Sequence, residues 1–164
     1  AATSTTTTST ATTVPTTQPG EPDWAAIVQG LLTTLHELRA APDIDRIGEL
    51  CLAGENLCQS RQGEEIRGYV DDGWRVEGMP LPIVVGAARA GTADDAPVDD
   101  ALWVLARTRL ERPDLTNARV VDSSGATVFD IVQDPDDPND VLDIYLVRAG
   151  DDWRVLAIDE PPTP

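Results

Sequence analysis

The chain has 164 residues, with 29 Asp and Glu against 12 basic residues, so its net charge at pH 7 is −17. This balance disfavours nucleic acid and anionic membrane surfaces as partners, because both need a basic protein surface. All 12 basic residues are Arg, which excludes a Schiff-base lysine, a P-loop lysine and a Ser–Lys nucleophile pair. The lone His36 excludes a zinc site built from several histidines, and the sequence predicts no cofactor.

Residues 1–22 have a strongly biased composition. Thr and Ser dominate this segment, no aromatic residue occurs in it, and its first charged side chain is Glu21. Such a segment has too little apolar surface to offset the entropy lost on ordering, and Thr/Ser-rich sequence with Pro is typical of extended, often O-glycosylated stalks. We therefore expect a disordered Thr/Ser/Pro stalk, one folded domain (residues 23–160) and a short disordered tail (161–164).

The stalk favours a secreted protein, or one anchored to the outer face of the cell membrane. No apolar run approaches the roughly 20 residues needed to span a bilayer. We therefore expect contact with a membrane only through a lipid anchor or a signal that has been removed. The Ala-Ala-Thr start suits a chain that begins just after such a site.

The clearest predicted helix covers residues 23–40. Asp23 is placed to cap its N-terminus, and Pro42 ends it. The apolar residues that share one face at helical spacing are Trp24, Ile27, Val28, Leu31, Leu35 and Leu38. A second, shorter helix is predicted from Asp43 through Cys51.

Cys51 and Cys58 are the only cysteines of the chain. Their C-x6-C spacing fits neither a redox C-x-x-C motif nor a zinc knuckle. Behind a stalk-like leader, an even cysteine count indicates a structural disulfide, worth roughly 2–3 kcal/mol for so short a loop. The alternative is a pair of buried free thiols, which would suit a cytosolic protein.

Two stretches in the middle of the chain fit two assignments each. Residues 64–76 fit either a short helix or a hairpin with a glycine-containing turn. Residues 98–112 are predicted to form a helix that is capped by Asp99 or Asp100 and stopped by Pro113, although they also alternate as a strand.

From Asn117 onward the apolar residues repeat with a period of two. ARVVD-SSG-ATVFDIVQ predicts one hairpin, and DVLDIYLV-RAGDD-WRVLAID predicts a second. Four consecutive strands would form an antiparallel meander with one face on a core. Helices followed by strands indicate an α+β fold, in which N-terminal helices pack on a curved antiparallel sheet of about four strands.

In residues 146–155, LVRAGDDWRV, a GDD turn is followed by W-R-V. Together with the long amphipathic first helix and the hairpin ARVVDSSGATVFDIV, this run resembles the nuclear transport factor two-like superfamily. Members are cone-shaped α+β domains, including polyketide-cyclase-like and ketosteroid-isomerase-like proteins, and some stand on stalks in secreted lipoproteins. The resemblance covers residues 23–159 and implies either a non-catalytic binding domain or a cavity for small apolar ligands. No catalytic motif of the superfamily matches this chain residue by residue.

An oxygen-rich loop is the one candidate metal site. It contains Asp134, Asp136, Asp137, Asn139 and Asp140, and calcium takes six to eight oxygen ligands. The spacing is not that of an EF-hand, and the glycine of that loop is missing. An ordinary acidic turn is the alternative.

The aromatic residues supply most of the large apolar area, and aromatic residues at such spacing usually form core. A ligand pocket lined by Trp74, Trp103, Phe129 and Tyr145 is the functional alternative.

The remaining candidates are titratable side chains. His36 is a candidate general base, but it lies off the apolar face of its helix, so a solvated histidine is expected. Asp130 and Asp143 lie on neighbouring predicted strands and form a candidate acid/base pair, although a solvated face is the default. A local basic cluster contains Arg107, Arg109, Arg112 and Arg119. Pairing with the many Asp residues is favoured over binding of an anionic ligand.

Three functions follow from these observations. The first is a non-enzymatic domain that binds another envelope protein. The second is a carrier or sensor that holds a small apolar ligand between helix and sheet. The third is a cofactor-free isomerase or cyclase of the resembled superfamily that uses Asp residues as base. A deep apolar cavity would favour the second, and a buried carboxylate of raised pKa inside it would favour the third.

Overall fold

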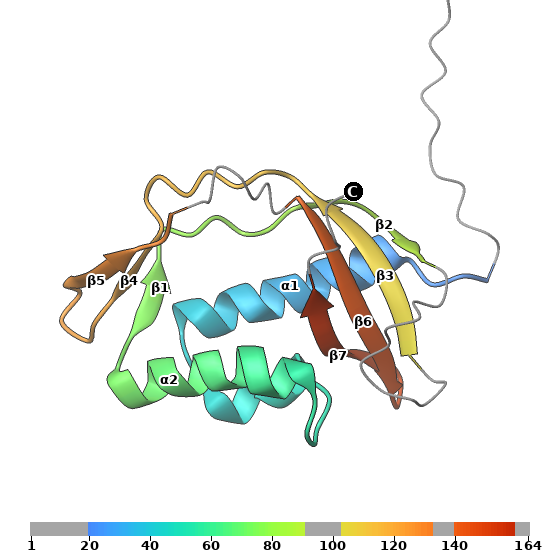
Figure 1. Cartoon of the computed structure of the whole chain (residues 1–164), viewed down its shortest axis with the longest axis horizontal. Coiled ribbons are helices and arrows are strands. Elements are labelled where there is room, and N and C mark those ends of the chain that lie inside the picture. The colour runs from blue at the N-terminus through green and yellow to red at the C-terminus, as the bar shows by residue number, and fades with distance from the viewer. Residues whose placement is uncertain (1–19, 91–102, 133–139, 160–164) are drawn as a thin grey trace, which may run out of the picture.

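The computed structural model describes residues 20–90, 103–132 and 140–159, so most of the predicted stalk and all of the predicted tail lie outside the described residues. The helices are α1 (Trp24–Ala40), the 3₁₀ helix η1 (Ile44–Glu49), the π-helical turn η2 (Gln59–Gly63) and α2 (Glu64–Asp72). The strands are β1 (Arg75–Glu77), β2 (Val84–Arg89), β3 (Trp103–Leu110), β4 (Arg119–Val121), β5 (Thr127–Asp130), β6 (Val141–Ala149) and β7 (Asp152–Asp159). They form two antiparallel sheets, ordered β1-β4-β5 and β2-β3-β6-β7 (Figure 1), and the predicted α+β fold is confirmed.

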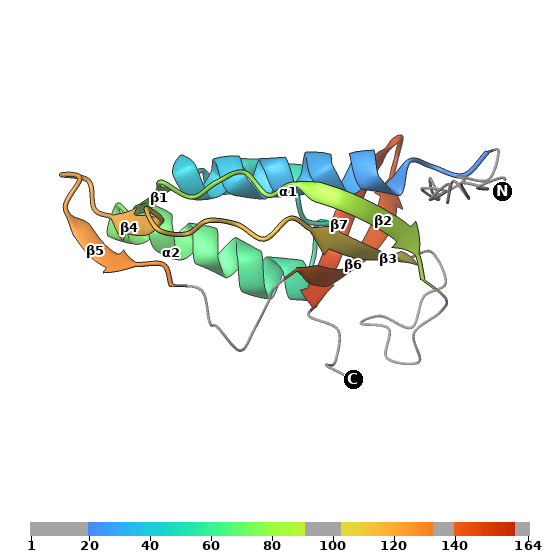
Figure 2. The same ribbon diagram turned by 90° about the horizontal axis from the view of Figure 1, so that it is seen from above.

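Helix α1 runs from one sheet to the other and contacts both (Figure 2). Its N-terminus is capped as predicted, because Asp23 Oδ1 accepts a hydrogen bond from the backbone N–H of Ala26 at 3.1 Å. Its buried residues are Trp24, Val28, Leu31, Leu32, Leu35 and Leu38. The four-stranded sheet packs against this face through Ala106, Ile144 and Leu146. The main core therefore lies between α1 and the larger sheet.

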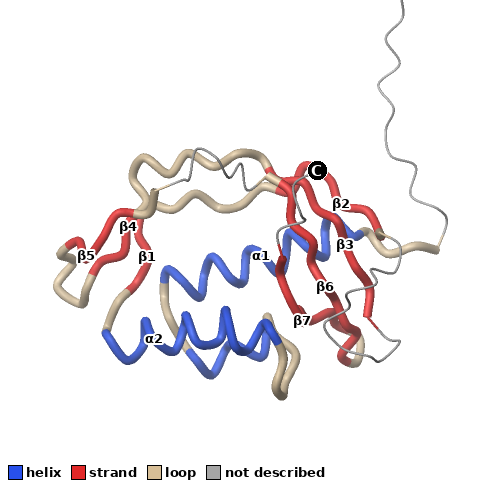
Figure 3. Tube along the Cα trace, viewed as in Figure 1, coloured by secondary structure: helices blue, strands red, loops and turns tan. Residues whose placement is uncertain are grey.

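Strands β1 to β4 form one long hairpin that is interrupted in the middle. Glu77 lies opposite Arg119 in the smaller sheet, and Val84 lies opposite Leu110 in the larger one. Between these two pairings, residues 78–83 face residues 111–118 across the gap between the sheets (Figure 3). These linkers contain Pro80, Pro82 and Pro113, and a proline has no backbone N–H to offer to a strand ladder. The single hairpin is thereby divided between two sheets.

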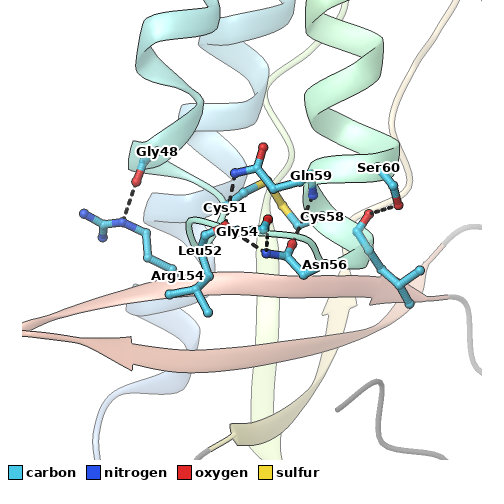
Figure 4. The surroundings of a disulfide bond; sticks show 10 residues. Gly48, Cys51, Leu52, Gly54, Asn56, Cys58, Gln59, Ser60 and Arg154 are labelled. Carbon is cyan, nitrogen blue, oxygen red and sulfur yellow. Dashed lines mark hydrogen bonds between the residues drawn. A yellow bond between two sulfur atoms is a disulfide. The ribbon is translucent and has the colours of Figure 1, made fainter.

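The predicted disulfide between Cys51 and Cys58 is confirmed, with the two Cα atoms 5.5 Å apart and both side chains fully buried. The chain around Cys51 pairs with the edge strand β7, because Val155 N donates to Leu50 O at 2.8 Å and Leu52 N donates to Val155 O at 3.0 Å. Figure 4 shows the loop between the two cysteines closed over this edge. Disulfides persist in oxidising compartments, so the bond indicates an extracytoplasmic location.

The helix predicted over residues 98–112 is wrong, because residues 103–110 form the strand β3 and the rest of that range lies partly outside the described residues. Strand β3 lies between β2 and β6, so pairing on both sides overrides its local helical spacing. The hairpin alternative for residues 64–76 is also wrong: α2 fills most of that stretch, and β1 pairs with β4 instead.

Both predicted C-terminal hairpins form, as β4–β5 and β6–β7. They do not make one continuous meander, however. Hairpin β4–β5 joins β1 in the smaller sheet, whereas β6–β7 joins β3 in the larger one. The strand order follows from the interrupted hairpin, since β4 must stay beside β1 while β3 stays beside β2.

Candidate ligand-binding cavity

A cavity of about 350 Å³ lies beneath the interruption of the long hairpin. Its walls come from α1, from both linkers and from the ends of β6 and β7; the apolar side chains that form them include Leu32, Leu35, Met79, Leu115, Leu142 and Ile158. Pockets for small molecules typically occupy about 300–1,000 Å³ and are mainly apolar with a few polar groups. The cavity is therefore of a size and lining that suit a small organic ligand.

The proline linkers explain why this space stays open. In a continuous hairpin, residues 78–83 and 111–118 would pair with each other through their backbones. Their prolines have no backbone N–H to donate, so the strand ladder does not continue through these segments. One backbone bond still joins the two linkers at the edge of the larger sheet, where Glu111 N donates to Ile83 O at 2.8 Å. Pro80, Pro82 and Pro113 themselves line the cavity.

Four polar side chains also line the cavity: His36, Arg39, Gln62 and Glu111. Arg39 is already paired, because its guanidinium donates two hydrogen bonds to Glu65, at 3.0 and 2.8 Å. Glu65 also accepts from the hydroxyl of Tyr69 at 3.2 Å. Burial, followed by the nearby Glu65 charge, raises the pKa of Tyr69 to about 12.

Gln62 differs from the other polar groups of the cavity. Its side-chain oxygen Oε1 is buried and accepts no hydrogen bond from any residue that the structure describes. The residue belongs to η2, a single π-helical turn between Cys58 and α2, and such turns occur frequently at functional sites. Buried acceptors are nearly always satisfied in folded proteins, so this oxygen marks a position where another molecule can donate.

The structure does not bring the four predicted aromatic pocket residues together. Trp74 packs against Phe129 of the smaller sheet, with ring centroids 6.2 Å apart, and Trp103 packs against Tyr145 of the larger sheet at 5.6 Å. Tyr145 lies on the sheet face that is opposite to α1, in a separate apolar cluster with Leu105. None of the four residues lines the cavity beneath the linkers.

Most of the predicted calcium loop, including Asp134, Asp136 and Asp137, lies outside the described residues. Asp140 is described: it precedes β6, and its backbone oxygen accepts from Leu110 N at 2.7 Å. Within residues 20–90, 103–132 and 140–159, no group of three or more potential metal ligands gathers.

His36 is not the fully solvated residue that the sequence predicts, because it is half-buried and lines the cavity. It lies one turn from Leu32 on α1, and the linker that carries Met79 and Pro80 covers this side of the helix. Helical spacing alone does not reveal this cover, since the linker is more than forty residues away in the sequence.

Asp130 and Asp143 do not form a pair. Asp130 is exposed in the smaller sheet, whereas Asp143 is only 6% exposed in the larger one, which corrects the predicted solvated face. Arg107 lies opposite Asp143 and donates two hydrogen bonds to it, both at 2.8 Å, and this contact raises the pKa of the guanidinium. Of the predicted basic cluster, Arg107 thus pairs internally, as does Arg119 with Glu77 at 3.5 Å.

Comparison with known proteins finds few similarities. No protein-family model matches the chain, and no curated protein matches it. Among solved structures, the crystal structure of the intermembrane space region of chloroplast protein ARC6 is similar, with a TM-score of 0.48 and 8% sequence identity. The match covers 82% of this chain and 94% of that one.

Proposed function

We propose that this chain is an extracytoplasmic domain that binds a small, mainly apolar molecule in the cavity beneath its proline linkers, as a carrier or a sensor. The observation that carries the proposal is the cavity itself, with about 350 Å³ and mainly apolar walls between α1, the two linkers and the end of the larger sheet. The long first helix packed on an antiparallel sheet supports membership of the nuclear transport factor two-like superfamily as part of this proposal.

The proposed location is outside the cytoplasm, in secreted or lipid-anchored form. The buried disulfide supports an oxidising compartment, and the Thr/Ser/Pro composition of residues 1–22 supports a stalk that holds the domain away from a surface. Within the described residues, none of the helices combines the length and hydropathy that crossing a bilayer requires.

Ligand binding is favoured over acid/base catalysis by the position of the carboxylates. The one carboxylate that lines the cavity, among the described residues, is Glu111, and it is exposed at the rim. Asp143 is buried, but both of its oxygens accept hydrogen bonds from Arg107 on strand β3. Among the described residues the cavity therefore holds no buried carboxylate that could serve as the Asp base of the isomerase or cyclase alternative.

The neutral fluorophore N-phenyl-1-naphthylamine tests the proposal, because its emission rises when it enters an apolar site. We expect a saturable rise with the whole chain that is lost in Leu115→Trp, since the indole would fill the cavity. The matched control is Val85→Trp, where the same side chain is added at a position that is 58% exposed and outside the cavity. Equal binding by the two variants, or no binding by the wild type, would contradict the proposal.

A second candidate function, binding of another envelope protein, is favoured by one surface feature. Leu81, Ile83 and Val85 are 44%, 50% and 58% exposed and alternate from the end of the linker 78–83 into the edge strand β2. A photo-crosslinking residue at position 83 is expected to capture one reproducible partner in the native envelope, whereas the same residue at the exposed Asp71 of α2 should not. Identical capture patterns at the two positions would argue against this function.

A further inference from the structure

The buried oxygen of Gln62 indicates the chemistry of the molecule that the cavity accepts. A carbonyl oxygen without a donor costs free energy when it is shielded from water, and roughly nine in ten buried polar groups avoid this cost by pairing. Gln62 lines the cavity, so a small rotation of its side chain would present this oxygen to a molecule bound there. A ligand with a hydrogen-bond donor at this position would satisfy the oxygen, whereas a ligand without one would leave it unpaired.

The other polar groups of the cavity narrow the choice of ligand. Arg39 is neutralised by its two hydrogen bonds to Glu65, so it does not offer a free cation to an anionic ligand. The net charge of −17 repels anions over a longer range. His36 forms no hydrogen bond with another residue that the structure describes and lines the same cavity, so it remains available as a polar neighbour.

We propose that the cavity selects neutral, mainly apolar molecules that carry a hydrogen-bond donor, either a hydroxyl or an N–H group, and that Gln62 Oε1 accepts from this donor. The inference rests on the proposed ligand-binding function. It goes further by naming the ligand class and the residue that recognises it. Gln62 contributes specificity, and the apolar walls contribute most of the affinity.

Two matched pairs of compounds test the inference: 2-naphthol against 2-methoxynaphthalene, and indole against 1-methylindole. Within each pair the ring system is the same, and only one member has an O–H or N–H donor. Equilibrium dialysis against the whole chain gives the ratio of the two dissociation constants. Because the added methyl group contributes the same apolar gain with every variant, the change in this ratio between variants reports the hydrogen bond alone.

We expect the preference for the donor-bearing compound to fall about fivefold in Gln62→Met, the size of one neutral hydrogen bond. The variant keeps the length of the side chain and removes its acceptor. The control is Gln59→Met, one turn earlier on the same segment, whose Nε2 donates to Leu52 O at 3.0 Å and which does not line the cavity. This control should leave the ratio unchanged.

The outcomes separate the two proposals. If the wild type binds both members of each pair and the ratio is the same in Gln62→Met, the role of Gln62 is refuted while ligand binding stands. If the wild type binds none of the four compounds, both proposals fail. A fivefold drop that appears equally in Gln59→Met would also overturn the assignment to Gln62, because that residue lies outside the cavity. Far-ultraviolet circular dichroism establishes that both variants are folded.

Discussion

The side-chain oxygen of Gln29 accepts a hydrogen bond from the backbone N–H of Val84 at 2.9 Å, and its Nε2 donates to the backbone oxygen of Pro82 at 2.8 Å. These two bonds take the place of the backbone hydrogen bonds that a neighbouring strand would make with the start of the edge strand β2. One residue of α1 thus protects this edge and also fixes the linker that covers the cavity.

Replacing Gln29 by Leu is therefore expected to lower the free energy of unfolding by about 2 kcal/mol, because a backbone N–H and a backbone carbonyl lose their partners. Urea unfolding followed by tryptophan fluorescence measures the change. The control is Thr34→Leu, on the same helix, whose hydroxyl donates only to the helix backbone at Gly30. A Gln29→Leu variant as stable as this control would show that the two bonds contribute nothing.

The parts of the fold that the sequence predicts are those set by local signals. Asp23 and Pro42 bound α1, the Ser-Ser-Gly and Gly-Asp-Asp turns locate the last two hairpins, and two cysteines leave one pairing to consider. Strand β3 was predicted as a helix because its identity depends on β2 and β6, which are distant in sequence. Tertiary pairing of this kind overrides local propensity.

The cavity was not predicted, because its walls come from segments far apart in the chain. Met79 and Leu115 meet only once β1 pairs with β4 and β2 with β3. A signal was nevertheless present: Pro80 and Pro82 precede β2 and Pro113 follows β3, and a proline has no backbone N–H to offer to a strand ladder. Gln62 gives no signal of its own, since an unpaired oxygen is visible only in three dimensions.

Removing the disulfide is expected to destabilise the fold without changing its topology. The Cys51→Ala/Cys58→Ala variant should lose about 2–3 kcal/mol of unfolding free energy, the entropy that the closed loop removes from the unfolded chain. The wild type in excess reductant should behave in the same way, whereas the variant should not respond to reductant. Titration of free thiols in the denatured, unreduced wild type should find none, and two thiols per chain would contradict the bond.

Gly78 should tolerate no side chain. It has a φ of +69°, and a Cβ at this position would lie 2.0 Å from the backbone oxygen of Asn117 in the opposite linker. Gly78→Ala is therefore expected to cost about 3 kcal/mol, from left-handed strain plus displacement of backbone. Gly150→Ala separates the left-handed backbone strain from the steric clash, because Gly150 has a similar φ of +66° but open space around it. This control should cost only about 1 kcal/mol in thermal or urea unfolding, and equal costs would argue against the close approach of the linkers.

The raised pKa of Tyr69, about 12, predicts how stability changes in alkaline solution. An unfolded tyrosine loses its proton near pH 10. Between pH 10 and 12 the unfolded chain therefore releases a proton that the folded chain retains, so the free energy of unfolding falls as the pH rises through this window. Below pH 10 both states hold the proton, and the contribution is fully present.

Phenolate absorbance measures this directly, because the chain has two tyrosines and Tyr69→Phe removes one of them. The difference between the titrations of the folded wild type and the variant should have its midpoint near pH 12. The variant should also lose less stability than the wild type between pH 10 and 12, since phenylalanine has no proton to release. A difference titration centred near pH 10 would mean that the hydroxyl is solvated, and that it does not donate to Glu65 beside the cavity.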